Sequence, residues 1–240
     1  MTAVFRCGQA VESSRQPGYD AAGRKAKMNQ ESSQNWLHKV YGASDATELK
    51  QLYDNWAEDY DSDLQTYGYR YPAVLAGLAG RHLDPEGGPV LDAGAGTGLI
   101  GEMLAILGFS ELVGIDMSDG MLAVAQRKGV YSRLDNMTLG EHLDFADSSF
   151  AAVVSTGVLT VGHAPAESMD ELVRVTRPGG HLIFSLTVQT YEQDGFKQKL
   201  EALEAAGRCQ PLAVTSDFVG LVAVDDEVTH PARFFVYRAL

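Results

Sequence analysis

The clearest chemical feature of the sequence is a glycine-rich segment that contains one acid. It runs from Asp92 to Gly98 and follows a short apolar run that begins at Val90. Glycines at a strand-to-helix turn let the backbone approach a ligand closely, because no Cβ stands in the way. A dinucleotide fingerprint would place its third glycine where Leu99 stands, and the Gly-Lys-Ser/Thr of a P-loop is absent. The segment therefore predicts a bound nucleoside without a dedicated phosphate site.

A second acid, Asp116, ends the next apolar run, 22 residues after Gly94. An acid at the tip of a second parallel strand can accept hydrogen bonds from both hydroxyls of a ribose. The alternative is that Asp116 only caps the following helix, but Ser118 can supply that cap alone. Met117 can pack on an adenine ring, as thioethers do on aromatic faces. The carboxylate of Asp92 beside the glycines disfavours a pyrophosphate, so a cationic nucleoside, S-adenosyl-L-methionine, is the expected cofactor.

Apolar strands and helices must alternate to hold these loops at one end of a sheet. We expect strands at 90–93, 112–116, 151–155, 181–186 and 233–239, and helices at 99–107, 120–128, 165–175 and 191–206. Asp45 followed by Glu48 predicts a capping box for an earlier helix, and another helix is expected around 74–78. This alternation is typical of an α/β fold with a parallel sheet covered on both faces.

The motifs at 91–98, 114–118, 149–150 and 177–180 resemble those of class I S-adenosylmethionine-dependent methyltransferases. More narrowly, the segments 53–61, 131–134 and 138–140 are similar to the methyltransferase-like proteins of the Williams–Beuren region. The resemblance implies a Rossmann-like, seven-stranded, mostly parallel sheet with helices on both faces and an antiparallel last strand. It covers residues 45–240, with a helical lid at 45–80, after a partly disordered extension at 1–44.

The expected cofactor site combines the two acidic loops with the lid and the segment before the fourth strand. Relatives place an acid near residue 139 for the adenine amino group; this chain has leucine there, so backbone groups are expected to hold the adenine. On the lid, an arginine could pair with the methionine carboxylate and an aromatic face could contact the sulfonium, although Trp56 could equally be core. The residues expected to contact the cofactor are Trp56, Tyr60, Arg70, Asp92, Ala93, Gly94, Gly96, Gly98, Asp116, Met117, Met121, Thr138, Leu139 and Thr156.

The methyl acceptor is expected beyond the fourth strand, close to His163. This histidine is the candidate general base, and the alternative is an ordinary surface-loop histidine before the Pro165 helix start. A base is needed only for an acceptor that holds its proton near neutral pH, because in-line methyl transfer otherwise depends on alignment and exclusion of water.

The expected acceptor is a small molecule, and three other functions compete with it. A protein methyltransferase is disfavoured because the segment 155–158 reads Ser-Thr-Gly-Val rather than an Asn-Pro-Pro-Tyr/Phe motif. A non-catalytic, cofactor-binding partner subunit is the second alternative. A nicotinamide oxidoreductase is the most distant one, since the dinucleotide fingerprint is incomplete.

Composition narrows the partners and the location. With 19 Lys and Arg against 32 Asp and Glu, the net charge is −13, which disfavours nucleic acid. The two cysteines, Cys7 and Cys209, are isolated, so neither a disulfide frame nor a metal site is expected, and the protein should be cytoplasmic. No apolar run is long enough for a membrane helix. Residues 1–28 are read as a loose extension, with a transit peptide as the alternative.

Overall fold

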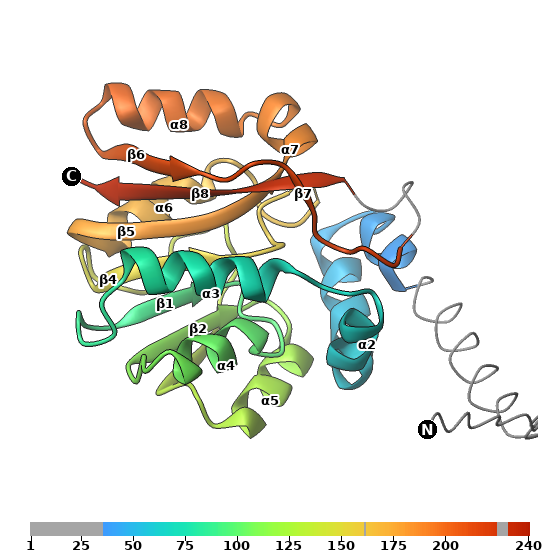
Figure 1. Cartoon of the computed structure of the whole chain (residues 1–240). Coiled ribbons are helices and arrows are strands. Elements are labelled where there is room, and N and C mark those ends of the chain that lie inside the picture. The colour runs from blue at the N-terminus through green and yellow to red at the C-terminus, as the bar shows by residue number, and fades with distance from the viewer. Residues whose placement is uncertain (1–35, 161, 225–229) are drawn as a thin grey trace, which may run out of the picture.

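The computed structural model describes residues 36–160, 162–224 and 230–240 of the chain. A single eight-stranded sheet has the spatial order β3-β2-β1-β4-β5-β8-β6, and β7 pairs with β8 beside that path (Figure 1). Strands β1 to β5 run parallel to one another, whereas β8 is antiparallel to β5, β6 and β7. The strands are β1 (Val90–Ala93), β2 (Leu112–Asp116), β3 (Arg133–Asn136), β4 (Phe150–Ser155), β5 (Thr176–Thr187), β6 (Cys209–Val214), β7 (Phe218–Val219) and β8 (Pro231–Ala239).

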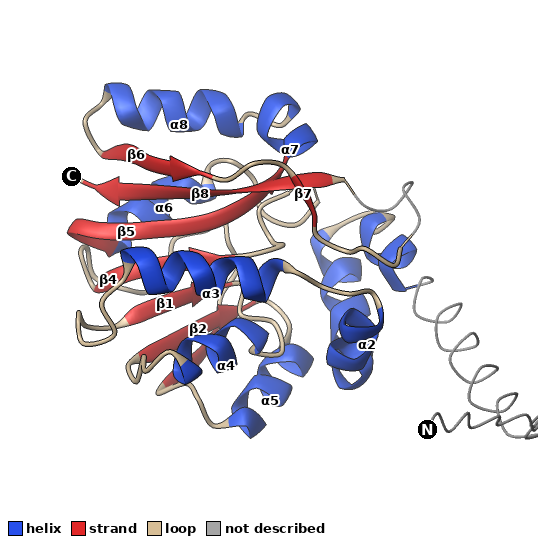
Figure 2. Ribbon diagram, in the orientation of Figure 1, coloured by secondary structure: helices blue, strands red, loops and turns tan. Residues whose placement is uncertain are grey.

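Helices cover both faces of the sheet (Figure 2). They are α2 (Ala46–Thr66), α3 (Tyr71–His82), α4 (Leu99–Ile106), α5 (Asp119–Lys128), α6 (Ser168–Val175), α7 (Val188–Gln193) and α8 (Phe196–Ala205). Leu75 of α3 shares one buried cluster with Val154 of β4, and Leu172 of α6 shares another with Val153. Successive side chains of a strand point to opposite faces, so β4 contributes to both cores, which explains its uninterrupted apolar run.

The packed part of the chain extends upstream of the expected boundary at residue 45. Residues 36–41 are helical, and Leu37 and Val40 are buried with the α2 side chains. Asp45 caps α2 as predicted, since its Oδ1 accepts a 2.9 Å hydrogen bond from the backbone N–H of Glu48. The Glu48 carboxylate reaches the N–H of Ser44 rather than that of Asp45. Residues 1–35, with the expected disorder and the transit-peptide alternative, lie outside the described part of the chain.

The predicted α/β architecture is confirmed, with corrections to its detail. The described chain has eight strands rather than seven, because the two-residue β7 adds to the seven of the main path. Neither β3 nor β6 was predicted from the apolar pattern. The helix expected at 191–206 is two helices, α7 and α8, separated at Asp194 and Gly195, where Gly195 has φ 83°. Helix α6 ends at Val175, before residues 177–180, as expected. These residues already belong to β5.

Candidate functional site

The glycine loop follows β1 and requires glycine at its start. Gly94 has φ 83°, and a Cβ there would lie 2.4 Å from the Cγ2 of Val158. The N–H groups of Gly94 and Ala95 both donate 2.9 Å hydrogen bonds to the carbonyl oxygen of Ile115. The loop is therefore held between β2 and the segment after β4, with its backbone close to both.

Asp116 ends β2 and ties the loops together. Its Oδ2 accepts a 2.9 Å hydrogen bond from the N–H of Gly96, and its Oδ1 accepts one of 2.9 Å from the N–H of Ser118. Burial raises the pKa of Asp116, and these backbone hydrogen bonds oppose the rise. Ser118 caps α5 itself, since its Oγ accepts a 3.1 Å bond from the N–H of Met121. Each carboxylate oxygen of Asp116 keeps acceptor capacity for a ligand hydroxyl.

Asp92 lies behind the glycine loop rather than in a cavity. Its side chain is 1% exposed, and its Oδ2 accepts a 2.6 Å hydrogen bond from the hydroxyl of Tyr131. Burial raises the pKa of Asp92 to about 7, although the hydrogen bond from Tyr131 lowers it. Direct contact with the cofactor, expected from the sequence, does not fit this position, because the carboxylate is covered by protein.

A cavity with about 820 Å³ of empty space, part of it open to solvent, lies at the carboxyl ends of β1, β2 and β4. Most of the residues singled out from the sequence meet here. Those that line it are Tyr60, Gly94, Gly96, Asp116, Met117, Met121, Thr138, Leu139, Thr156 and His163. The other lining residues are Tyr53, Tyr69, Ala95, Thr97, Leu99, Ile100, Met137, Gly157, Val158 and Ala164. Methionine and tyrosine side chains with one central acid suit an adenosine that carries a positive charge.

Four more predicted residues are absent from this lining. Trp56 is 1% exposed and donates a 2.8 Å hydrogen bond from Nε1 to Asp63, so its role is in the core, the alternative that the sequence left open. Arg70 is exposed, lies just before α3 and does not line the cavity. Ala93 is buried at the end of β1. Gly98 packs beneath the loop, where a Cβ would lie 3.0 Å from the ring of Tyr131.

Two tyrosines that the sequence did not assign complete the wall of the cavity. Tyr53 of α2 and Tyr69 line it beside Tyr60, and burial raises the pKa of all three phenols well above 10. The hydroxyl of Tyr53 lies 2.9 Å from Nε2 of His163. Tyr53 shares an apolar helical face with Leu49 and Leu52, so the sequence spacing left a core position and a site position equally open.

Helix α2 lies beside α5 (Figure 1), and polar contacts join the two elements. The Oδ1 of Asp54 accepts hydrogen bonds from the Ser118 hydroxyl at 2.6 Å and from the Gly120 N–H at 2.9 Å. Asp61 forms a 2.7 Å ion pair with Lys128 and accepts a hydrogen bond from the Thr97 hydroxyl in the glycine loop. The helical lid expected at 45–80 therefore contacts both acidic loops.

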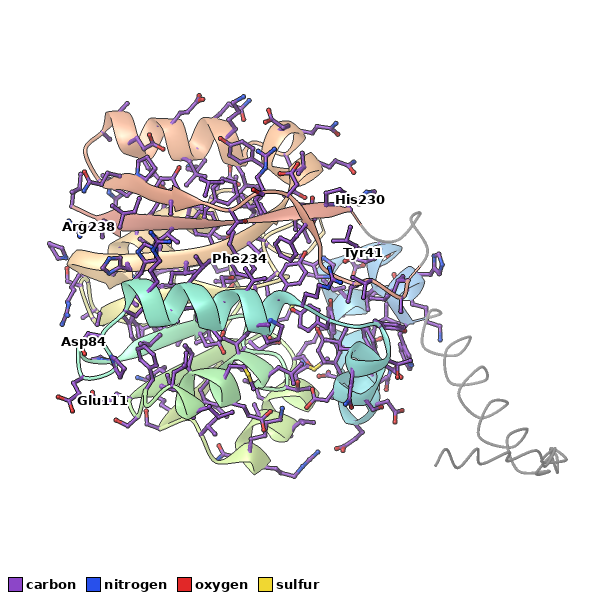
Figure 3. The ribbon with its side chains drawn as sticks, in the orientation of Figure 1. Tyr41, Asp84, Glu111, His230, Phe234 and Arg238 are labelled. Atoms are coloured by element: carbon purple, nitrogen blue, oxygen red, sulfur yellow. The ribbon has the colours of Figure 1, made fainter. Side chains whose placement is uncertain are left out.

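A second cavity adjoins the first and shares Gly157 with it. It holds about 1580 Å³ of empty space that is partly open to solvent. Figure 3 shows two of its residues, Tyr41 and His230, at the α2 end of the sheet, opposite Asp84 and Arg238. Its lining residues are His38, Tyr41, Gly42, Tyr71, Gly157, Leu159, Thr160, Ser185, Thr187, Gln189, Thr190, Asp194, Leu221 and His230. Among the described residues, no group of three or more His, Cys, Asp or Glu could hold a metal.

Within the described ranges, none of the helices has the length and apolar character needed to cross a membrane.

The chain is similar in sequence and in fold to known methyltransferases. Residues 91–184 match the family model described as a methyltransferase domain. Methyltransferase-like protein 27 of Homo sapiens is 38% identical over 184 residues, which cover 73% of this chain and 74% of that protein. The demethylmenaquinone methyltransferase of Renibacterium salmoninarum is 35% identical over 144 residues, 57% of each protein. A solved S-adenosylmethionine-dependent methyltransferase of Thermotoga maritima has the same fold, with a TM-score of 0.55 and 18% identity over 78% of this chain and 97% of that one. The chain thus belongs to the class I S-adenosylmethionine-dependent methyltransferases, and S-adenosyl-L-methionine is its cofactor.

Proposed function

We propose that the protein transfers a methyl group to a small-molecule acceptor bound in the second cavity. The observation that carries the proposal is that the two cavities meet at Gly157, directly after β4. The second cavity is a hollow lined by side chains from several elements of the chain, the usual form of a small-molecule site. An acceptor held there would face the cofactor across Gly157.

In the first cavity, we propose that Asp116 holds the ribose hydroxyls and that the glycine loop holds the amino-acid part of the cofactor. Thr138 and Leu139 would accompany the adenine, with Met117 and Met121 against its faces. When bound, the cofactor supplies an electrophilic methyl group on a sulfonium. The chain aligns that methyl with the acceptor and keeps water out, which is the main requirement of an in-line displacement.

The names of the relatives support a small-molecule acceptor without identifying it. Demethylmenaquinone, in the name of the Renibacterium salmoninarum protein, is a small molecule. The acidic composition supports an acceptor other than nucleic acid. Together with the isolated cysteines, it also supports a cytoplasmic location. A protein acceptor and a non-catalytic role beside a partner subunit are the alternatives that the following experiment separates.

The test begins with isothermal titration of S-adenosylhomocysteine into the wild-type chain and Asp116→Ala. We expect micromolar binding that the variant loses. Methyl-labelled cofactor is then incubated with the enzyme and either the protein-free or the protein fraction of a cell extract. Label in the small-molecule fraction supports the proposal, label in protein supports a protein methyltransferase, and binding without transfer supports a non-catalytic role.

A further inference from the structure

Two side chains that lie far apart in sequence meet at the boundary of the cofactor cavity. Tyr53 on α2 and His163 in the segment between β4 and α6 are separated by 110 positions, yet the phenol oxygen lies 2.9 Å from Nε2. Their rings meet edge to face, with centroids 5.7 Å apart. Both side chains line the cofactor cavity. Neither lines the second cavity, but Tyr41 of that cavity lies next to His163, with ring centroids 5.9 Å apart. The pair therefore lies on the cofactor side of the boundary between the two cavities.

The backbone holds His163 in a tight turn after β4. The N–H of His163 and that of Ala164 both donate to the carbonyl oxygen of Thr160, at 3.1 and 3.2 Å. The imidazole also lines a third cavity, together with Glu167 and Asp194. His163 therefore lies between the cofactor cavity and this third cavity, which gives its proton a route out of the site.

A protonated Tyr53 can donate a hydrogen bond to His163. Burial raises the pKa of this phenol well above 10, so the oxygen keeps its proton at neutral pH. In the Nδ1–H tautomer of neutral His163, Nε2 accepts the hydrogen bond from this hydroxyl, and this is the arrangement that a proton relay requires. A phenol oxygen that donates its proton can still accept one hydrogen bond. A methyl acceptor that reaches Tyr53 could therefore donate its hydrogen bond to the phenol oxygen, while His163 acts as the base behind it.

We propose that Tyr53 and His163 form a proton relay for a hydroxyl-bearing methyl acceptor. As the acceptor oxygen forms its bond to the methyl carbon, the carbon–sulfur bond breaks and its electron pair stays on sulfur. The acceptor's hydroxyl proton moves to the oxygen of Tyr53, and the proton of Tyr53 moves to Nε2 of His163. The products are a methyl ether, S-adenosylhomocysteine and an imidazolium, which releases its proton to solvent. This inference rests on the proposed function.

The linings of the cavities narrow the class of acceptor. Neither Lys nor Arg is among the described residues that line the cofactor cavity or the adjoining one. A carboxylate or phosphate on the acceptor would therefore lack a lysine or arginine partner. Tyr41 and Tyr71 instead offer aromatic surface, and the side chains of Ser185 and Thr187 offer hydrogen bonds. The site fits an uncharged phenol or alcohol, an acceptor that holds its proton near neutral pH and needs a base.

The relay is tested with Tyr53→Phe and His163→Gln in the full chain. Phenylalanine keeps the ring that packs on Trp56 but removes the hydroxyl. Tyr237→Phe is the matched control, because its hydroxyl donates a 2.8 Å hydrogen bond to Glu204 far from the cavities. With labelled cofactor and the protein-free fraction of a cell extract, we expect each relay variant to slow transfer by about 100-fold or more, with at most a small change in S-adenosylhomocysteine affinity. The control should transfer at the wild-type rate.

The pH profile and the imidazole itself give readouts that a packing role would not move. The described titratable groups that contact His163 or share a cavity lining with it include Tyr41, Tyr53, Tyr60, Tyr69, Asp116, Glu167 and Asp194. We expect an acid limb in the wild-type rate profile that His163→Gln lacks. In nuclear magnetic resonance spectra of the S-adenosylhomocysteine complex, His163 should be the Nδ1–H tautomer, and Tyr53→Phe should change its tautomer ratio and apparent pKa.

Wild-type transfer rates in both relay variants would overturn the relay, as would an imidazole unaffected by Tyr53→Phe. If the wild type transfers no label to small molecules, the proposed function fails. The resonance experiment then still decides whether the Tyr53–His163 hydrogen bond exists. Transfer that is slowed only because cofactor affinity falls equally would assign Tyr53 to cofactor binding and also overturn the relay.

Discussion

The replacement Asp92→Asn should stabilise the cofactor-free protein, and more strongly at high pH than at low pH. Asp92 is 1% exposed, and burial raises its pKa from 3.8 to about 7. Its Oδ2 accepts a hydrogen bond from Tyr131, whereas its Oδ1 has no hydrogen-bond partner among the described residues. The charged form of this carboxyl is therefore poorly solvated in the fold.

The sign follows from the protons bound by each state. Between pH 3.8 and about 7, the folded chain keeps a proton on Asp92 that the unfolded chain has released, so stability falls as pH rises. The slope is about 1.4 kcal/mol per pH unit, which gives a penalty of about 4 kcal/mol above pH 7. About 3 kcal/mol of that penalty develops between about pH 5 and about pH 7. Asparagine does not ionise, and its amide oxygen can still accept from Tyr131.

The assay is urea unfolding of the wild type and Asp92→Asn at about pH 5 and about pH 8, without cofactor. The free-energy difference between the two proteins should grow by about 3 kcal/mol from the lower to the higher pH. Asp217→Asn is the control. Arg233 lowers the pKa of this exposed carboxyl, so Asp217 is ionised at both pH values and its replacement should change the free energy of unfolding equally at each. A difference for Asp92→Asn that is the same at both pH values would refute the argument.

Three further changes probe the loop, the lid and the acid stability of the fold. Gly94→Ala should destabilise the protein by about 1–3 kcal/mol, because φ at this position is 83° and the new Cβ would lie 2.4 Å from Val158. The variant should also lose S-adenosylhomocysteine binding in calorimetry, and a wild-type affinity would contradict this. Asp54→Ala removes the acceptor of two hydrogen bonds at the start of α5 and should weaken that binding about tenfold, measured the same way. An unchanged affinity would show that α2 does not help to hold the ligand. Arg174 lowers the pKa of Glu171 to about 2, so Glu171→Gln should lower the free energy of unfolding in urea by about 1–3 kcal/mol at neutral pH. This loss of stability should shrink as the pH falls from 4.5 towards 2. A loss that is the same at every pH would exclude the ion pair as its cause.

The central strands could be predicted from the sequence, and two outer strands could not. Strands β1 and β4 are buried on both faces, so their residues form short apolar runs between turns. Strand β3 lies at one edge of the sheet, and its four residues, Arg133–Asn136, are only partly buried or exposed. Strand β6 lies at the other edge and contains Pro211. Edge strands need less apolar surface and tolerate proline, which removes the pattern that identifies a strand.

The sequence by itself determined the cofactor loops, because their chemistry is local. Gly94 directly follows β1 and Asp116 ends β2, and any fold that forms these parallel strands brings their ends together. Only the tertiary structure decided which side chains face the cavity. Asp92 turns back towards Tyr131, and Tyr53 reaches His163 across 110 positions. Such contacts depend on how α2 and the loops pack over the sheet, and side-chain direction at that distance leaves no trace in sequence spacing.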